Sequence, residues 1–273
     1  MTSLTLESTL PPARGRASWP GALRSEWTKI RSLRSTVWTL VSTAVVTIGL
    51  SILFAWGATE HIKSRGHVPS DIDVTQLSMS GLIFGQLVIT VLGAMTITGE
   101  YGTGMIRTSL TAQPRRYVTI LSKLTVFTAV TFVTGLICTF ISFFVGQRFF
   151  AQVNLAASIG DHNVLRAVIG GALFLTVAGL LAFGLGAILR HTAGAITASV
   201  AVLFISFILF QFLPDDWKIE VQRWIPFYDG TGIWQTGPTD VNSWGPWTGF
   251  AVFGAYALAA LIGGLVSFRT RDA

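Results

Sequence analysis

The residues best suited to chemistry lie in a short polar segment between two long apolar runs. From Thr98 to Arg107 the sequence reads TGEYGTGMIR, and Pro114, Arg115 and Arg116 follow a few residues later. The segment combines a carboxylate with small residues and three guanidinium groups, which can form charge-assisted hydrogen bonds with one another or with another protein. The pattern predicts a short helix at a membrane surface that is held by a second protein.

Two features of the segment support this interpretation. Glu100 lies at a membrane boundary, where it can pair with Arg107 or with a basic residue of the partner. The glycines at 99, 102 and 104 permit sharp backbone turns where the chain leaves one helix and enters the next. The alternative is that Glu100 only caps a helix and that the arginines only follow the general bias of basic residues towards the cytoplasm.

The elements that position this segment are membrane spans. Charged residues form only 12% of the 273 positions, against roughly a quarter in soluble domains, while hydrophobic residues form 51% and the mean hydropathy is +0.61. Six apolar runs approach or exceed the roughly 20 residues that a helix needs to cross a bilayer. We place them near 37–56, 79–98, 118–146, 165–189, 192–213 and 246–267. The predicted fold class is an all-α integral membrane protein with six transmembrane helices.

The basic residues predict how these spans are oriented. An even number of spans places both termini on one side, and that side carries 13 of the 19 lysines and arginines. Because basic residues concentrate in cytoplasmic loops, we expect a multi-pass protein of the cell membrane with both termini in the cytoplasm. The first run is longer than the apolar region of a signal peptide and should remain in the mature protein. The net charge of +6 needs no nucleic acid partner, because basic inner loops explain it.

The N-terminal region divides into two parts. Residues 1–20 are predicted to form a flexible cytoplasmic leader, and 21–273 a single membrane domain. Apolar residues then recur at spacings of three and four, while basic residues take other faces, which predicts an amphipathic helix in the headgroup region. Its residues are Leu23, Trp27, Lys29, Ile30, Arg31, Leu33 and Arg34. The alternative is a basic anchor beside the membrane that makes no partner contact.

The connection before the last span, at about 214–245, mixes tryptophans with charged residues. Indole rings favour the headgroup boundary, so the connection is expected to dip back into the interface as short helices broken at Pro226 and Gly230. The residues assigned to this feature are Trp217, Trp224, Ile225, Pro226 and Phe227. A flexible loop carrying an aromatic belt is the alternative. The earlier connection at 57–78 is predicted to be a solvated external loop.

Several kinds of chemistry are missing from the sequence. It contains no phosphate-binding GxxxxGK[ST] loop, no GxGxxG, no GxSxG, no HExxH and no CxxC, so we predict no catalytic, cofactor-binding or metal-binding residues. No acidic residue lies deep in a predicted span, whereas an ion-driven carrier usually needs an ionisable group near the membrane midplane. If the chain moves a substrate, its energy is expected to come from another protein.

Several segments of the chain together resemble permease subunits of the ABC-2 transporter class, in the form common in actinobacteria. They are residues 23–38 (LRSEWTKIRSLRSTVW), the segment 98–107 with 114–116, 190–196 (RHTAGAI), 224–227 (WIPF) and 269–273 (RTRDA). The resemblance extends over nearly the whole chain from about residue 21. No single motif is very specific, but the order and spacing of these segments among six spans are typical of the class.

The resemblance implies an amphipathic elbow helix before the first span, a coupling helix between spans two and three, and re-entrant external helices before the last span. It also implies a permease dimer, formed with a second copy or a paralogue, that binds two separate ATPase subunits. Contact with the ATPase would then involve Gly99, Glu100, Tyr101, Gly102, Thr103, Gly104, Arg107, Arg115 and Arg116. In this chain the order is Glu100, Tyr101, Gly102 and Thr103, which matches one variant of the family's coupling segment.

The sequence therefore predicts a transmembrane permease subunit of an ABC transporter, and the resemblance favours export. This chain would not itself be an enzyme, because ATP and magnesium would bind to the partner subunit. Two alternatives remain open at this stage. One is a membrane scaffold or sensor that transports nothing, and the other is an ion-coupled secondary carrier.

Overall fold

The computed structural model describes residues 19–66, 68, 72–102, 116–237 and 244–270, and all regular structure in these ranges is helical. Six helical stretches are long and apolar enough to cross a membrane. They are Arg34–Arg65, Leu82–Gly102, Val118–Val153, Val164–Leu189, Thr192–Gln211 and Pro246–Phe268. The predicted all-α fold with six membrane helices is confirmed for the described ranges.

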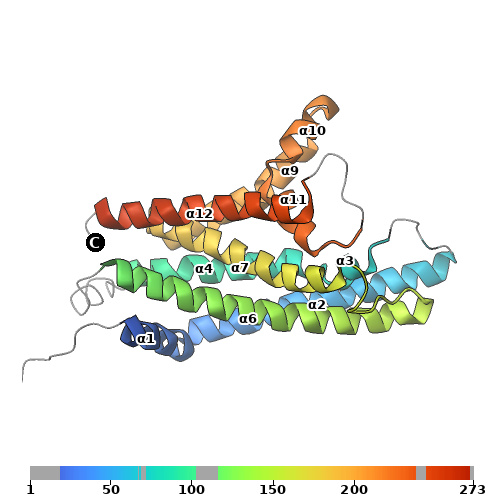
Figure 1. The fold of residues 1–273 in the computed structure, drawn as a ribbon, viewed down its shortest axis with the longest axis horizontal. Coiled ribbons are helices and arrows are strands. Elements are labelled where there is room, and N and C mark those ends of the chain that lie inside the picture. Colours follow the sequence, from blue (N-terminus) through green and yellow to red (C-terminus); the bar gives the residue numbers. More distant parts are fainter. Residues whose placement is uncertain (1–18, 67, 69–71, 103–115, 238–243, 271–273) are drawn as a thin grey trace, which may run out of the picture.

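The helices form one elongated bundle (Figure 1). The long helices are α2 (Arg34–Arg65), α4 (Leu82–Gly102), α6 (Arg116–Phe150), α7 (Val164–Leu189) and α12 (Pro246–Thr270). The fifth span consists of α8 (Thr192–Val200), a π-helical turn at Ala201–Ile205 and α9 (Ser206–Gln211). Shorter helices are α1 (Trp19–Ser32), α3 (Val74–Ser78), α10 (Asp215–Gln222) and α11 (Pro226–Thr231), with 3-10 turns at Ala151–Val153 and Gly232–Trp234.

Helix α7 is the centre of the bundle. Two-thirds (67%) of its span is buried inside the protein, against 17% for α2 and 22% for the α8–α9 span. Glycines allow its neighbours to approach closely, since small residues let helix backbones touch. A Cβ atom placed on Gly184 would lie 2.6 Å from the backbone carbon of Ala260 in α12. The long lipid-facing or partner-facing surfaces therefore belong to α2 and to the fifth span.

The two ends of the bundle differ. One end, the α1 end, gathers α1, the last turn of α4, the first turns of α6 and the C-terminal end of α12 (Figure 1). The opposite end, the α3 end, carries α3 and the segment from α10 to the 3-10 turn at Gly232–Trp234 (Figure 1). Helix α1 and the C-terminal end of α12 therefore lie at the same end of the bundle, as an even number of spans requires.

Helix α2 (Arg34–Arg65) extends well past its predicted span of 37–56, and α6 (Arg116–Phe150) extends a few residues past its predicted span of 118–146. They contain 32 and 35 residues, so at about 1.5 Å per residue they are roughly 48 and 52 Å long, against about 30 Å of hydrocarbon. At the α3 end they share a small separate core of Ala55, Ile62 and Phe150. The prediction that residue 57 begins a loop is therefore wrong, because packing between the two helices continues α2 to Arg65.

Helix α1 begins at Trp19 and ends at Ser32, and Leu33 separates it from α2 in an extended conformation. The predicted apolar stripe does not face the bundle, because Trp27 and Leu33 are both about half exposed (52% and 51%). The buried residues of α1 are instead Ala22 and Glu26. The helix therefore attaches to the bundle through a partly charged face and turns Trp19 and Trp27 outward, whereas Leu23 and Ile30 are partly buried.

Candidate functional site

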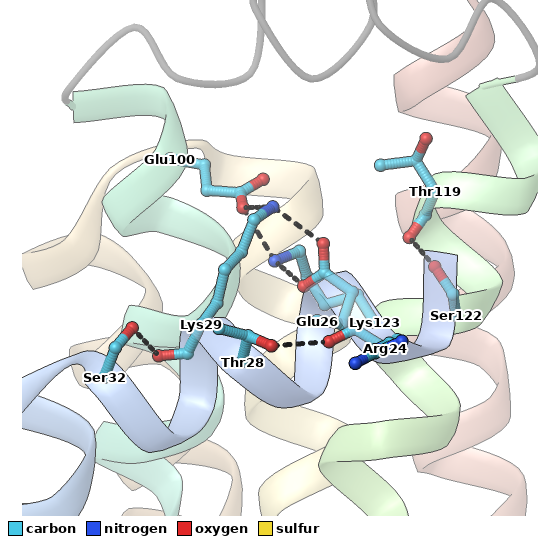
Figure 2. A network of polar contacts seen from close by, with 9 residues as sticks. All are labelled: Arg24, Glu26, Thr28, Lys29, Ser32, Glu100, Thr119, Ser122 and Lys123. Carbon is cyan, nitrogen blue, oxygen red and sulfur yellow. Dashed lines mark hydrogen bonds and ion pairs between the residues drawn. The ribbon is translucent and has the colours of Figure 1, made fainter. Parts of the chain in front are cut away.

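Four oppositely charged side chains form a closed ring at the α1 end. Glu26 and Lys29 come from α1, Glu100 from the last turn of α4, and Lys123 from the start of α6 (Figure 2). The Lys29 ammonium donates to Glu26 Oε1 at 2.7 Å and to Glu100 Oε1 at 2.9 Å. The Lys123 ammonium donates to Glu26 Oε2 at 2.7 Å and to Glu100 Oε1 at 2.8 Å. The ring carries no net charge and joins three helices.

This charged ring is largely removed from water. The side chains of Glu26 and Lys123 are each 5% exposed, Glu100 is 9% exposed, and Lys29 is 23% exposed. Burial by itself lowers the pKa of Lys29, but its hydrogen bonds to Glu26 and Glu100 and the attraction of both carboxylates raise that pKa above its ordinary value. Each charge in the ring is therefore stabilised by the others, and removal of one leaves an uncompensated buried charge.

Local sequence explains how α1 supplies two members of the ring. Glu26 and Lys29 are three residues apart, which places them on one face of the helix about one turn apart. Figure 2 shows α1 running across the ends of α4 and α6, so this face meets both helices at once. Glu100 and Lys123 lie on either side of the stretch 103–115, and their ion pair ties together the two helices that this stretch connects.

The last turn of α4 makes a second set of contacts on its other side. The Arg190 guanidinium lies 5.0 Å from the centre of the Tyr101 ring and donates to the Ser267 carbonyl of α12 at 2.9 Å. Thr98 Oγ1 and Thr192 Oγ1 are 2.8 Å apart and share a hydrogen bond between α4 and α8. The last turn of α4 therefore contacts α1, α6, α8 and, through Arg190, the end of α12.

Arg190 occupies a special backbone position in the turn between α7 and α8. Its φ of 57° is in the left-handed region, and its N–H caps α7 by donating to the Gly186 carbonyl. His191 then caps the start of α8, where its Nδ1 accepts from the N–H of Gly194 at 3.2 Å. Only Arg190 and His191 separate α7 from α8, so the fourth and fifth spans are joined by a tight turn.

Comparison with known protein families decides the class of this molecule. The sequence profile described as ABC-2 family transporter protein matches residues 22–210, well over half of the chain. The chain belongs to the ABC-2 transporter family. The match includes most of α1, all four members of the charged ring, the first four spans and nearly all of the fifth, and it ends before α10. None of the curated proteins compared with the chain matches it.

Membership of the ABC-2 family makes the chain a membrane transport component and not itself a catalyst. Within the part of the chain that the structure describes, no group of three or more His, Cys, Asp or Glu residues is arranged to hold a metal ion. The buried charges at the α1 end pair with one another, and their arrangement joins helices. The site is thus a connection between the ends of three helices.

The residues assigned to ATPase contact are only partly described. Gly99, Glu100, Tyr101 and Gly102 lie in the last turn of α4. Thr103, Gly104, Arg107 and Arg115 lie outside the described residues, and Arg116 begins α6 with no description of its side chain. The expected pairing of Glu100 with Arg107 therefore stays a prediction, whereas the partners that the structure gives are Lys29 and Lys123.

The expected role of two glycines is corrected. Gly99 and Gly102 lie within α4, and neither is among the residues with positive φ, so they form no turn. A Cβ atom at either position would meet nothing within 4 Å. The ion pairs of Glu100 hold the last turn of α4 against α1 and α6, so the helix continues to Gly102. The two glycines add no side chain to the surface of this turn.

Two ring members, Glu26 and Lys123, were not among the predicted site residues, although Lys29 was. Glu26 is the one acid in the basic sequence of α1, and Lys123 is a cation placed inside an apolar run. An ionisable residue inside a membrane span is itself a sign of function, and usually has a partner. That signal was present, but the partner lies 97 positions away in sequence.

The aromatic residues predicted before the last span lie at the opposite end, far from the ring (Figure 1). Trp217 and Trp224 are exposed, whereas Ile225, Pro226 and Phe227 are buried. The break expected at Pro226 is confirmed, since α11 begins there, but the break expected at Gly230 is wrong. Gly230 lies inside α11, where a Cβ atom would come within 2.9 Å of two aromatic rings, so it serves close packing.

One buried acid at the α3 end was not anticipated. Asp229 in α11 is 5% exposed, and within the described chain its Oδ2 has no hydrogen-bond partner. The backbone of Asp229 lies against Gly249 of α12. Burial raises the pKa of the Asp229 carboxyl to about 7, so this group keeps its proton to a higher pH than an exposed aspartate does.

Proposed function

We propose that this ABC-2 family protein is a permease subunit driven by ATP hydrolysis on a separate cytoplasmic ATPase, which binds ATP and magnesium. The observation that supports this most directly is the charged ring of Glu26, Lys29, Glu100 and Lys123. It joins α1 to both helices that border residues 103–115, the stretch that we assign to ATPase contact. A force applied to that stretch would reach three helices through four short ion pairs.

The ring can transmit such a force because its members are largely removed from water. In a poorly solvated site a separated ion pair is costly, so α1 and the ends of α4 and α6 should move together. The contacts of Tyr101 and Thr98 extend the same movement to the turn between α7 and α8 and to α12. The ATPase would therefore act on helix ends that are connected to one another, namely those of α1, α4, α6 and α12.

The remaining parts of the proposal follow from composition and exposure. We assign the α1 end to the cytoplasm, because the segments predicted on that side carry 13 of the 19 lysines and arginines and such residues concentrate in the cytoplasm. A second permease copy or a paralogue completes the path, using the little-buried faces of α2 and the fifth span. The direction is outward, which the resemblance to ABC-2 permeases favours.

The test is reconstitution of the purified chain with its ATPase in lipid nanodiscs, with ATP hydrolysis measured with and without the permease. We expect the permease to change the hydrolysis rate, and Glu100→Gln to abolish that change while ATPase binding persists. Glu60→Gln is the matched control, because Glu60 forms an exposed ion pair with Lys63 at the opposite end. If Glu100→Gln, shown by thermal melting to remain folded, couples as well as the wild type, the proposed route is wrong.

A further inference from the structure

The fifth span changes its hydrogen-bond register near its middle. Helix α8 ends at Val200, a π-helical turn covers Ala201–Ile205, and α9 begins at Ser206. A π-helical turn pairs each N–H with a carbonyl five residues earlier, so it contains one more residue than the α-helical turn that it replaces. Single π-helical turns inside helices are frequent at functional sites. This turn therefore marks the fifth span as a candidate moving part.

Ser206 contacts the hydrogen-bond acceptors of both registers. Its N–H donates to the Ala201 carbonyl, five residues earlier, as a π-helix requires. Its hydroxyl donates to the Val202 carbonyl, four residues earlier, which is the acceptor that the same N–H would use in an α-helix. The N–H of Ser206 thus has an acceptor in either register, and its own hydroxyl competes with it for one of them.

The half of the span nearer the α1 end, α8, is attached to the centre of the bundle. It packs against α4 and α7, and its residues Ala195 and Ser199 are completely buried. Thr192 also shares a hydrogen bond of 2.8 Å with Thr98 of α4. The position of α8 is therefore set by α4 and α7.

The segment that faces the other half, from α11 to the 3-10 turn that follows it, is also firmly held. Arg166 of α7 donates to the Ile233 carbonyl at 3.1 Å. Asp73, at the start of α3, accepts from the N–H of Thr236 at 2.6 Å. Gly230 of α11 fits so closely against two aromatic rings of the bundle that a Cβ atom would come within 2.9 Å of them. This segment is thus a fixed surface against which another element can move.

The half of the span nearer the α3 end, α9, has weaker attachments. Figure 1 shows α9 and α10 leaning away from the bundle. Apart from its neighbours in sequence, α9 packs mainly against α11. The ring centre of Phe207 lies 4.6 Å from that of Phe227 and 5.3 Å from that of Tyr228. Gln211 adds one hydrogen bond, from its Nε2 to the Tyr228 hydroxyl at 3.0 Å. A few ring contacts and one hydrogen bond are individually weak, so α9 is the half that can leave its position.

We propose that the π-helical turn is a hinge that gives the outer half of the fifth span two positions. In the first position, the rings of α9 lie on α11. When the turn becomes α-helical, its extra residue joins the helix, which rotates α9 by about 100° and moves it by about 1.5 Å along its axis. The rings of α9 then leave α11, and a gap opens between the two at the α3 end. The register change is a property of this chain alone, whereas its use as an outer gate rests on the proposed transport function.

The distance between two spin labels on the purified full chain in lipid nanodiscs tests the hinge. Ile208→Cys in α9 and Leu258→Cys in α12 carry the labels, because both positions are at least half exposed (50% and 57%). Cys138→Ala first removes the one native thiol. A side chain on a helix 10–12 Å across moves by about 8 Å in a 100° rotation, so the two positions of α9 give two separate distances.

Ser206→Ala should raise the population at the second distance about fivefold, because the N–H of this residue then has no competitor at the Val202 carbonyl. Ser199→Ala is the matched control. It removes a similar hydroxyl bond, to the Ala195 carbonyl, from a regular α-helical part of the same span. It should leave the two populations unchanged.

Two further variants act on the hinge in opposite directions. Phe207→Leu removes both ring contacts with α11 and should raise the population at the second distance about tenfold. Deletion of Ile205 removes the extra residue, so the span becomes α-helical with α9 still on α11, and only the first distance should remain. One unchanged distance in the wild type, Ser206→Ala and Phe207→Leu would overturn the hinge, and Phe207→Leu decides alone if Ser206→Ala fails to fold. No ATPase takes part in these measurements, so the hinge and the proposed coupling can fail independently.

Discussion

A double-mutant cycle on Glu100 and Lys123 gives the sharpest test of the charged ring. Their pair is 2.8 Å long and both side chains are more than nine-tenths buried. Removing one partner of such a pair costs about 3–5 kcal/mol, chiefly because the other charge stays buried and unpaired. We therefore expect Glu100→Gln or Lys123→Met alone to lower the free energy of unfolding by about that amount.

The double variant should be much less unstable than the sum of the singles. It leaves Glu26 and Lys29 as a neutral pair at 2.7 Å, so no net charge remains in the cluster. We expect a coupling of about 2–3 kcal/mol in favour of the double variant, at the upper end of measured values because the two residues touch. The measurement is reversible unfolding in mixed detergent micelles, followed by tryptophan fluorescence.

Two outcomes would refute this reasoning. Additive effects would mean that Glu100 and Lys123 do not stabilise each other, and a small effect of both singles would mean that water reaches the ring. The matched control is the exposed pair of Glu60 and Lys63, whose side chains are 50% and 38% exposed. The same cycle there should give a coupling below about 1 kcal/mol, as exposed ion pairs usually do.

Three further predictions concern other parts of the bundle. Asp229 has a folded pKa of about 7, above its ordinary value of 3.8. Its contribution to stability is therefore complete below about pH 4 and is lost as the pH rises to about 7. Asp229→Asn should make the melting temperature fall less steeply between about pH 4 and about pH 7 than it does in the wild type. Arg190→Gly should be more stable than Arg190→Ala by about 1 kcal/mol, because both lose the contact with Tyr101 but only glycine relieves the left-handed backbone. Gly184→Ala should destabilise the fold by about 1–3 kcal/mol, since its Cβ meets the α12 backbone, whereas Gly254→Ala, with nothing within 4 Å, should be neutral or slightly stabilising in the same melts.

The sequence predicted the spans well and their ends less well, for a physical reason. Hydropathy registers the part of a helix that lies in hydrocarbon, so it finds the apolar cores of α2 and α6. It does not register the continuation of these helices past the membrane, which depends on contacts between Ala55, Ile62 and Phe150. Such contacts join positions far apart in the chain and leave no local periodic signal.

The charged ring was likewise predictable in its local parts but not in the contacts between distant parts of the chain. The segment around Glu100 was recognisable from its composition and from its family resemblance, and Lys29 from the pattern of α1. Their connection was not, because the ring also needs Glu26, which the pattern of α1 does not single out, and Lys123, which lies inside the predicted third span. A carboxylate in a basic helix and a lysine inside an apolar run were the two local irregularities that pointed to it.

The attachment of α1 explains why this protein uses charges where a soluble protein would use an apolar core. Next to a bilayer, lipid tails compete with the protein for apolar side chains, so burial of Trp27 or Leu33 against the bundle would gain little. Both side chains are in fact exposed, and α1 attaches through Glu26 and Lys29 instead. Ion pairs in a poorly solvated site have a definite geometry, whereas apolar contacts with lipid on one side can slide. A helix held in this way keeps its position relative to α4 and α6 when they move, which is the property that a mechanical connection to an outside motor requires.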